Sequence, residues 1–171
     1  MTLPLKDEFA VLSDTWHMDQ ALLWRAPVMP RPRPTVLISD DEPLMVSALA
    51  RQARREGLDF LSDTSSERVL ELVRAHRPEV VILDINQRID GRDLLAQLKR
   101  DPETKDTAVV VLSGNDDQFT RTLCLQLGAD DYQTKPVDPT FMIRISRLAH
   151  ERAGGSRGPH DDGGGAIASA A

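Results

Sequence analysis

The stretch Val80–Gly91, VVILDINQRIDG, carries the strongest structural signal in this sequence of 171 residues. Four apolar residues, Val80 to Leu83, run without interruption into Asp84, after which the chain becomes polar. A short, wholly apolar run that ends in turn-forming residues is typical of a strand buried on both faces of a parallel sheet. Asp84 then falls at the carboxyl end of a central strand, which is where open α/β sheets bind their ligands.

Three further runs with strand character also end in polar residues. The runs and the residues that follow them are 35–39 (TVLIS) before Asp40-Asp41, 109–112 (VVVL) before Ser113, and 131–134 before Lys135-Pro136. The carboxyl ends of parallel strands meet at one edge of a sheet. We therefore expect three carboxylates, a hydroxyl and an ammonium group to converge at that edge.

The strands alternate with segments of helical character. Helices are predicted over residues 43–56, 64–76, 91–100, 116–127 and 139–152, with a short second strand at 58–61. The predicted helix that follows this strand opens with Thr64-Ser-Ser-Glu67, which has the pattern of a capping box. Five strand–helix units predict an α/β domain, a parallel five-stranded sheet wrapped by helices on both sides.

Composition narrows the classes of function. Hydrophobic residues make up 40% of the chain and aromatic residues 4%, so the core should be aliphatic. The net charge of −6 supplies no basic field for nucleic acid, and no direct nucleic-acid contact is expected. The single Cys124 excludes an internal disulfide and suits a reducing compartment. Without a membrane-length apolar run or a signal-peptide pattern, a cytoplasmic protein with no membrane contact is expected.

The ends of the chain differ from its centre. Residues 1–33 form an extension in which a helix is predicted over 7–24, followed by a proline-rich connector. Trp16 and Trp24 lie there, and this segment is either a loosely ordered leader or a helix that docks a partner or a second copy. Residues 34–152 form the predicted domain, and the Gly-, Ser- and Ala-rich tail 153–171 is expected to be disordered and too short for an output domain.

Three clustered carboxylates need a positive charge to neutralise them. Asp40, Asp41 and Asp84 offer oxygen ligands of the kind that Mg²⁺ prefers, and Mg²⁺ is usually held by one or two carboxylates together with a phosphate. Lys135 adds a point charge suited to phosphate, and Ser113 adds a hydroxyl donor. A carboxylate that attacks phosphorus makes an aspartyl phosphate, so the site is suited to phosphoryl transfer.

From Thr35 to Arg152 the chain resembles the receiver domain of two-component response regulators. The resemblance rests on the four strand-end motifs above and on GADDYQTKP, residues 128–136. It implies a flavodoxin-like (βα)5 fold with strand order 2-1-3-4-5, and a sensor histidine kinase as partner. The roles that it implies are Asp84 as phosphoacceptor, Asp41, Asp84 and the carbonyl of Asn86 as Mg²⁺ ligands, Asp40 as a ligand through water, Lys135 as the phosphoryl-binding residue, and Ser113 with Tyr132 as the switch pair.

One segment departs from the family pattern. After the phosphoacceptor the family usually has an apolar residue followed by proline, and reaches its Asp-Gly one residue later. This chain has Asn86 to Gly91, NQRIDG, with no proline. The shortened loop carries the expected metal-binding carbonyl and borders the kinase-docking surface.

The sequence therefore predicts a stand-alone response regulator rather than an enzyme that acts on a metabolite. Its activity would be limited to self-catalysed phosphorylation and dephosphorylation of Asp84. The readout would pass to a downstream protein, to a histidine phosphotransfer protein or to a homodimer. Two alternatives stay open: a docking module of receiver fold that takes no phosphate, and a small phosphohydrolase with an aspartyl nucleophile. The second alternative normally needs a carboxylate two residues after the nucleophile, where this chain has Asn86.

Overall fold

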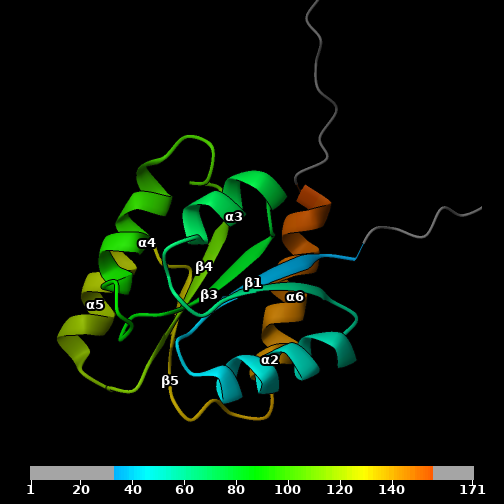
Figure 1. Cartoon of the computed structure of the whole chain (residues 1–171), viewed down its shortest axis with the longest axis horizontal. Helices are drawn as coiled ribbons and strands as arrows, with labels where there is room; N and C mark the ends of the chain where they lie inside the picture. The colour runs from blue at the N-terminus through cyan, green and yellow to red at the C-terminus, as the bar shows by residue number, and fades with distance from the viewer. Residues whose placement is uncertain (1–32, 156–171) are drawn as a thin grey trace, which may run out of the picture. The chain divides into compact units, whose positions relative to one another are not determined.

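The computed structural model describes residues 33–155. The helix expected over 7–24 and the segment after Gly155 lie outside the described residues. In chain order the elements are β1 (Thr35–Ser39), α2 (Pro43–Arg55), β2 (Asp59–Asp63), α3 (Val69–His76), β3 (Val80–Asp84), α4 (Gly91–Arg100), β4 (Ala108–Ser113), α5 (Gln118–Gln126), β5 (Asp131–Thr134) and α6 (Phe141–Gly155). Figure 1 shows the alternation of strands and helices along the chain.

All five strands belong to one parallel sheet in the order β2-β1-β3-β4-β5. The predicted fold class and strand order are confirmed. β3 lies at the centre, and every residue from Val80 to Asp84 is buried, as its unbroken apolar run predicts. The order reverses between β1 and β3, so the crevice at the carboxyl ends of these two strands is the position where such sheets bind ligands.

Alternate residues of the strands feed two separate cores, one on each face of the sheet. On one face, β1, β3 and β4 pack against α2 and α6, with Leu49 and Phe141 fully buried. On the other face the same strands pack against α3, α4 and α5, with Leu95 and Cys124 fully buried. Figure 1 shows α2 and α6 on one side of the sheet and α3, α4 and α5 on the other. Burial raises the pKa of the Cys124 thiol, as expected for a core residue.

The second strand begins and ends later than predicted. Leu58 was expected to open it, but its amide bonds to the carbonyl of Ala53 at 2.9 Å, within the turn that closes α2. Gly57 has φ +75, the left-handed conformation that commonly ends a helix. Leu58 therefore completes the end of α2 and contributes to the core, and β2 runs over Asp59–Asp63.

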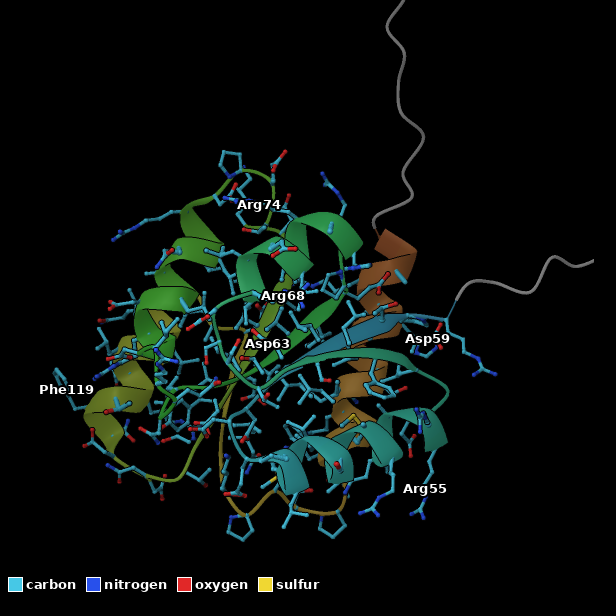
Figure 2. The ribbon with its side chains drawn as sticks, in the orientation of Figure 1. Arg55, Asp59, Asp63, Arg68, Arg74 and Phe119 are labelled. Atoms are coloured by element: carbon cyan, nitrogen blue, oxygen red, sulfur yellow. The ribbon has the colours of Figure 1, made fainter. Side chains whose placement is uncertain are left out.

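The predicted capping box at Thr64–Glu67 is wrong. α3 begins at Val69, and its N-cap position, Arg68, makes no side-chain cap hydrogen bond. The carboxylate of Asp63 organises this loop instead, because it accepts from the amides of Ser65 (3.1 Å) and Arg68 (3.0 Å). Figure 2 shows Asp63 and Arg68, at the end of β2 and before α3. Ser66 between them has φ +62, which interrupts any helix there.

α6 continues to Gly155, three residues beyond the predicted end at Arg152. Among residues 33–155, no helix combines the length and the apolar character that crossing a membrane requires.

Candidate functional site: the acidic carboxyl edge of the sheet

The structure brings the three predicted carboxylates together. Asp40 and Asp41 follow β1, Asp84 ends the neighbouring β3, and one oxygen from each lies within 4.8 Å of the others. Asp40 is 0% exposed and Asp84 4% exposed, whereas Asp41 faces solvent. The site is thus an acidic cluster in which Asp40 and Asp84 are buried and Asp41 lies at the protein surface.

Lys135 contacts both buried carboxylates of this cluster. Its Nζ donates to Asp40 Oδ2 at 2.7 Å and to Asp84 Oδ2 at 2.8 Å. Burial by itself lowers the pKa of Lys135, but the hydrogen bonds to the two carboxylates outweigh it and raise that pKa. Lys135 therefore stays charged at neutral pH. Its position comes from β5, which pairs with β4, and from the bond of its own amide to the Ser113 carbonyl at 2.7 Å.

The donor set fits a hard divalent cation. Three carboxylates and one ammonium group leave two uncompensated negative charges, and every available ligand atom of the cluster is an oxygen. Asp41 lies on the solvent side, which leaves room for the waters that Mg²⁺ retains. The backbone amide of Glu42 donates a hydrogen bond to Asp40 Oδ1 at 2.9 Å. This contact is consistent with an indirect role for Asp40 at a cation site.

Ser113 and Asn86 lie beside Asp84. The backbone amide of Asn86 donates to Asp84 Oδ1 at 2.8 Å, and Lys135 donates to Asp84 Oδ2, so both oxygens of Asp84 have a donor. The Asn86 side chain approaches Ser113 Oγ at 3.4 Å, and the amide of Asn115 donates to the same hydroxyl at 3.1 Å. Ser113 is fully buried at the end of β4. Contacts thus connect Asp84 with Lys135, and through Asn86 with Ser113.

The ring of Tyr132 points inward. It is 2% exposed, and its hydroxyl donates to the carbonyl of Asn115 at 2.9 Å. The guanidinium carbon of Arg121 lies 5.5 Å from the ring centroid. Because Asn115 also contacts Ser113, the two residues of the predicted switch pair are linked through one loop residue.

Sequence reasoning missed Gln87. Its side-chain nitrogen donates to the backbone carbonyl of Asp84 at 2.6 Å and to that of Ser39 at 3.1 Å. Its side-chain oxygen accepts from the hydroxyl of Ser66. The only sequence signal was indirect: a loop that lacks both the usual proline and one residue needs another restraint, and Gln87 lies inside that loop.

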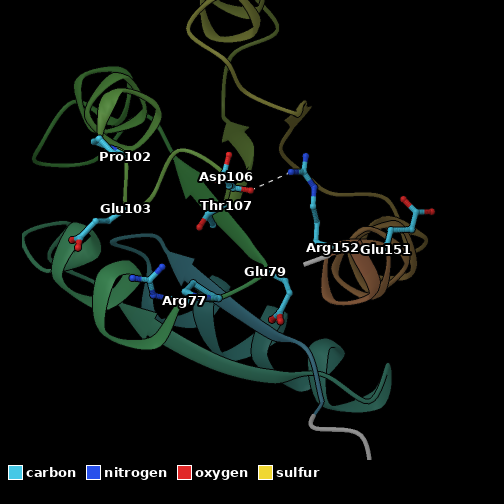
Figure 3. Close-up of a pocket in the computed structure, with 10 residues that line it drawn as sticks. Arg77, Glu79, Pro102, Glu103, Asp106, Thr107, Glu151 and Arg152 are labelled. Atoms are coloured by element: carbon cyan, nitrogen blue, oxygen red, sulfur yellow. Dashed lines mark hydrogen bonds between the residues drawn. The ribbon is translucent and has the colours of Figure 1, made fainter. Parts of the chain in front are cut away.

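A separate hollow lies at the opposite edge of the sheet, at the amino ends of β3 and β4 (Figure 3). Its volume is about 560 Å³, and its lining mixes arginines with acidic residues. Arg152 crosses it to donate to the carbonyl of Asp106 at 3.1 Å. None of the predicted site residues lines this hollow, so it is distinct from the acidic edge.

Comparison with known proteins identifies the same family. The sequence model of the response regulator receiver domain matches residues 36–146. The alkaline phosphatase synthesis transcriptional regulatory protein PhoP of Bacillus subtilis (strain 168) is 31% identical over 105 residues, 61% of this chain and 43% of that protein. The transcriptional regulatory protein AruR of Pseudomonas aeruginosa is 31% identical over 136 residues, 74% of this chain and 54% of that protein.

The chain spans about half the length of these curated relatives. Their names describe transcriptional regulators, so they give no support to the expectation that nucleic acid is not bound.

A solved structure agrees with the sequence comparisons. The crystal structure of a putative response regulator from Chloroflexus aurantiacus J-10-fl aligns with a TM-score of 0.64 and 26% identity, covering 69% of this chain and 98% of that one. The match to the receiver-domain sequence model extends from β1 into α6. This chain belongs to the family of response regulator receiver domains.

Proposed function

We propose that this chain is a phosphorylation-dependent signalling switch in which Asp84 accepts a phosphoryl group from a sensor histidine kinase with the help of Mg²⁺. The observation that carries the proposal is the position of Lys135, whose Nζ bonds Asp40 and Asp84 directly beside Asp41. Phosphoryl transfer asks a protein mainly for positioning and charge stabilisation. A buried carboxylate, a lysine and an oxygen-rich cation site within one crevice meet both needs.

In the proposed transfer, a carboxylate oxygen of Asp84 attacks the phosphorus atom of a phosphohistidine. The new O–P bond forms while the N–P bond breaks, and its electron pair stays on the imidazole nitrogen. The amide of Asn86 and Nζ of Lys135 hold the two Asp84 oxygens in place. Lys135 uses two of its three donors for carboxylates, which leaves one for a phosphoryl oxygen.

Asp41, Asp84 and the backbone carbonyl of Asn86 would hold Mg²⁺, with Asp40 acting through water. The bound ion would offset the charge on the transferred phosphoryl group. We propose no turnover of a metabolite. The output would be a change of protein–protein contacts, in which Ser113 and Lys135 follow the added charge and the face around β5 and Tyr132 rearranges. A downstream protein, a histidine phosphotransfer protein or a second copy of the chain would read that change.

Intact-mass spectrometry after incubation with acetyl phosphate and Mg²⁺ tests the proposal. The wild type should gain one phosphoryl group, and Asp84→Asn should gain none. Asp106→Asn is a matched control, because Asp106 is exposed and lines the hollow at the amino ends of β3 and β4, and it should behave as the wild type. An unmodified wild type that also binds no Mg²⁺ would favour a docking module of receiver fold that works without phosphate.

The phosphohydrolase alternative is tested separately. Asn86 occupies the position where such phosphohydrolases carry their second catalytic carboxylate. Its side-chain amide approaches the hydroxyl of Ser113 and offers no general base. An amide cannot take a proton from water at neutral pH, so we expect no steady turnover of a chromogenic phosphate ester. Sustained turnover that Asp84→Asn abolishes would reinstate this alternative.

A further inference from the structure

We infer that Gln87 is a positioning residue for the acidic site, because its side-chain amide fastens the short β3–α4 loop to the end of β1 and to the β2–α3 loop. The inference rests on the proposed function, since it assigns Gln87 to the same Mg²⁺ and phosphoacceptor site. Gln87 is not one of the strand-end residues from which the site was predicted.

The amide of Gln87 is engaged at both ends. Its nitrogen donates to the backbone carbonyls of Asp84 (2.6 Å) and Ser39 (3.1 Å) and lies 3.2 Å from Ser39 Oγ. Its oxygen accepts from Ser66 Oγ and lies 3.4 Å from Ser39 Oγ. Backbone carbonyls can only accept, so they define which end of the amide carries the nitrogen. One side chain thus joins three segments that the sheet brings to the same edge.

The partners of Gln87 are buried and constrained. Ser39 is 1% exposed and Ser66 is 2% exposed, so loss of the amide would leave buried hydroxyls without this partner. Ser66 also has φ +62, a conformation that costs a non-glycine residue free energy and persists where neighbouring contacts hold it. A neighbouring ion pair, Arg88 with Glu67 at 3.4 Å, joins the same two loops at the surface.

These contacts act on the site through the backbone. The side chain of Gln87 donates to the backbone carbonyl of Asp84. Two residues after Asp84, the backbone amide of Asn86 donates to Asp84 Oδ1. No proline stiffens the loop between Asp84 and Gly91, so its restraint comes from hydrogen bonds. Removal of the Gln87 amide should therefore loosen both the Asp84 carboxylate and the expected carbonyl ligand of Asn86.

The test is calorimetric titration of the unphosphorylated full chain with MgCl₂. Gln87→Ala and the volume-conserving Gln87→Met should each raise the Mg²⁺ dissociation constant by about tenfold, the usual effect of losing an outer-shell hydrogen bond at a metal site. Gln97→Ala, an exposed glutamine on α4, should leave it unchanged. Amide hydrogen exchange at Asn86–Gly91 should accelerate in both Gln87 variants while circular dichroism shows the fold retained.

A double substitution separates positioning from general loosening. If Gln87 acts through Ser66, then Ser66→Ala added to Gln87→Ala should weaken Mg²⁺ binding little further, although Ser66→Ala alone weakens it. Mg²⁺ affinities of both Gln87 variants equal to wild type would overturn the inference, as would a wild type that binds no Mg²⁺. A wild type that binds Mg²⁺ more tightly than the variants yet takes no phosphoryl group would support the inference and refute the proposed phosphotransfer.

Discussion

The backbone of Gly91 lies directly against the carbonyl of Asp84. A Cβ atom on Gly91 would be 2.6 Å from that carbonyl oxygen and 2.6 Å from Cα of Ile85. The amide of Gly91 also donates to the carbonyl of Ile85 at 3.3 Å. The loop that follows Asp84 therefore closes back on it so tightly that no side chain fits where α4 begins. This contact joins the geometry of the site to the stability of the fold.

Gly91→Ala should destabilise the protein by about 1–3 kcal/mol, the usual cost of forcing an extra methyl group into a packed site. The clash is with backbone atoms, which cannot turn aside as a flexible side chain can. Urea unfolding followed by circular dichroism measures the change. Gly114→Ala is the control, because a Cβ there meets nothing within 4 Å. Equal unfolding midpoints for the two variants would contradict the close approach.

Lys135→Met should remove the only positive side chain bonded to Asp40 and Asp84 within residues 33–155. We expect a loss of about 3 kcal/mol without Mg²⁺, because two buried carboxylates lose their ionic partner. Mg²⁺ should then raise the melting temperature more in the variant than in the wild type, since it binds a more negative cluster. Thermal unfolding with and without MgCl₂ measures both effects. The exposed Lys105→Met is the control, and a smaller Mg²⁺ effect in Lys135→Met would argue against the charge balance described above.

Asp138, before α6, should make stability depend on pH in acid. The hydroxyl of Thr140 and the guanidinium of Arg144 lower the pKa of Asp138 to about 2. A carboxylate with a lowered pKa adds stability above its ordinary pKa of 3.8 and loses it as pH falls toward 2. Between pH 4 and 2, Asp138→Asn should therefore lose less stability than the wild type. Asp106→Asn, an exposed aspartate, should keep the wild-type slope, and parallel profiles for all three proteins would contradict this assignment.

Tyr132 should contribute to stability mainly through its buried ring and less through its hydroxyl. Tyr132→Phe loses one hydrogen bond to the Asn115 carbonyl and should cost about 1 kcal/mol. Tyr132→Ala leaves a cavity beside α5 and should cost about 3–5 kcal/mol. Chemical unfolding measures both. Phosphorylation of Asp84 should survive in Tyr132→Phe, because the lost contact is to Asn115; loss of the adduct there would show that the hydroxyl acts on the acidic site itself.

The sequence alone determined the sheet and the edge that carries the site. β1 and β3 match the expected ranges Thr35–Ser39 and Val80–Asp84. Buried parallel strands need continuous apolar runs, and such runs are visible locally. The convergence of Asp40, Asp84 and Lys135 was equally predictable, because parallel strands place their carboxyl ends at one edge.

Local signals misled where a tertiary contact competed with them. The sequence of Thr64–Glu67 matches the capping-box pattern. In the structure, however, the loop amides donate to the carboxylate of Asp63, and the hydroxyl of Ser66 donates to the side chain of Gln87. The helix therefore starts at Val69. A capping pattern describes only four neighbouring residues, and it cannot register a partner that lies 21 residues away.

Only the tertiary structure decided which atoms meet at the edge. Gln87 reaches Ser39 across 48 residues of sequence, and Lys135 reaches Asp40 across 95. Periodicity and hydropathy determine which face a residue lies on, and so they predict the layers of the fold. Hydrogen bonds depend on distance and direction at a scale of tenths of an ångström, and these arise only when the packed strands bring distant loops together.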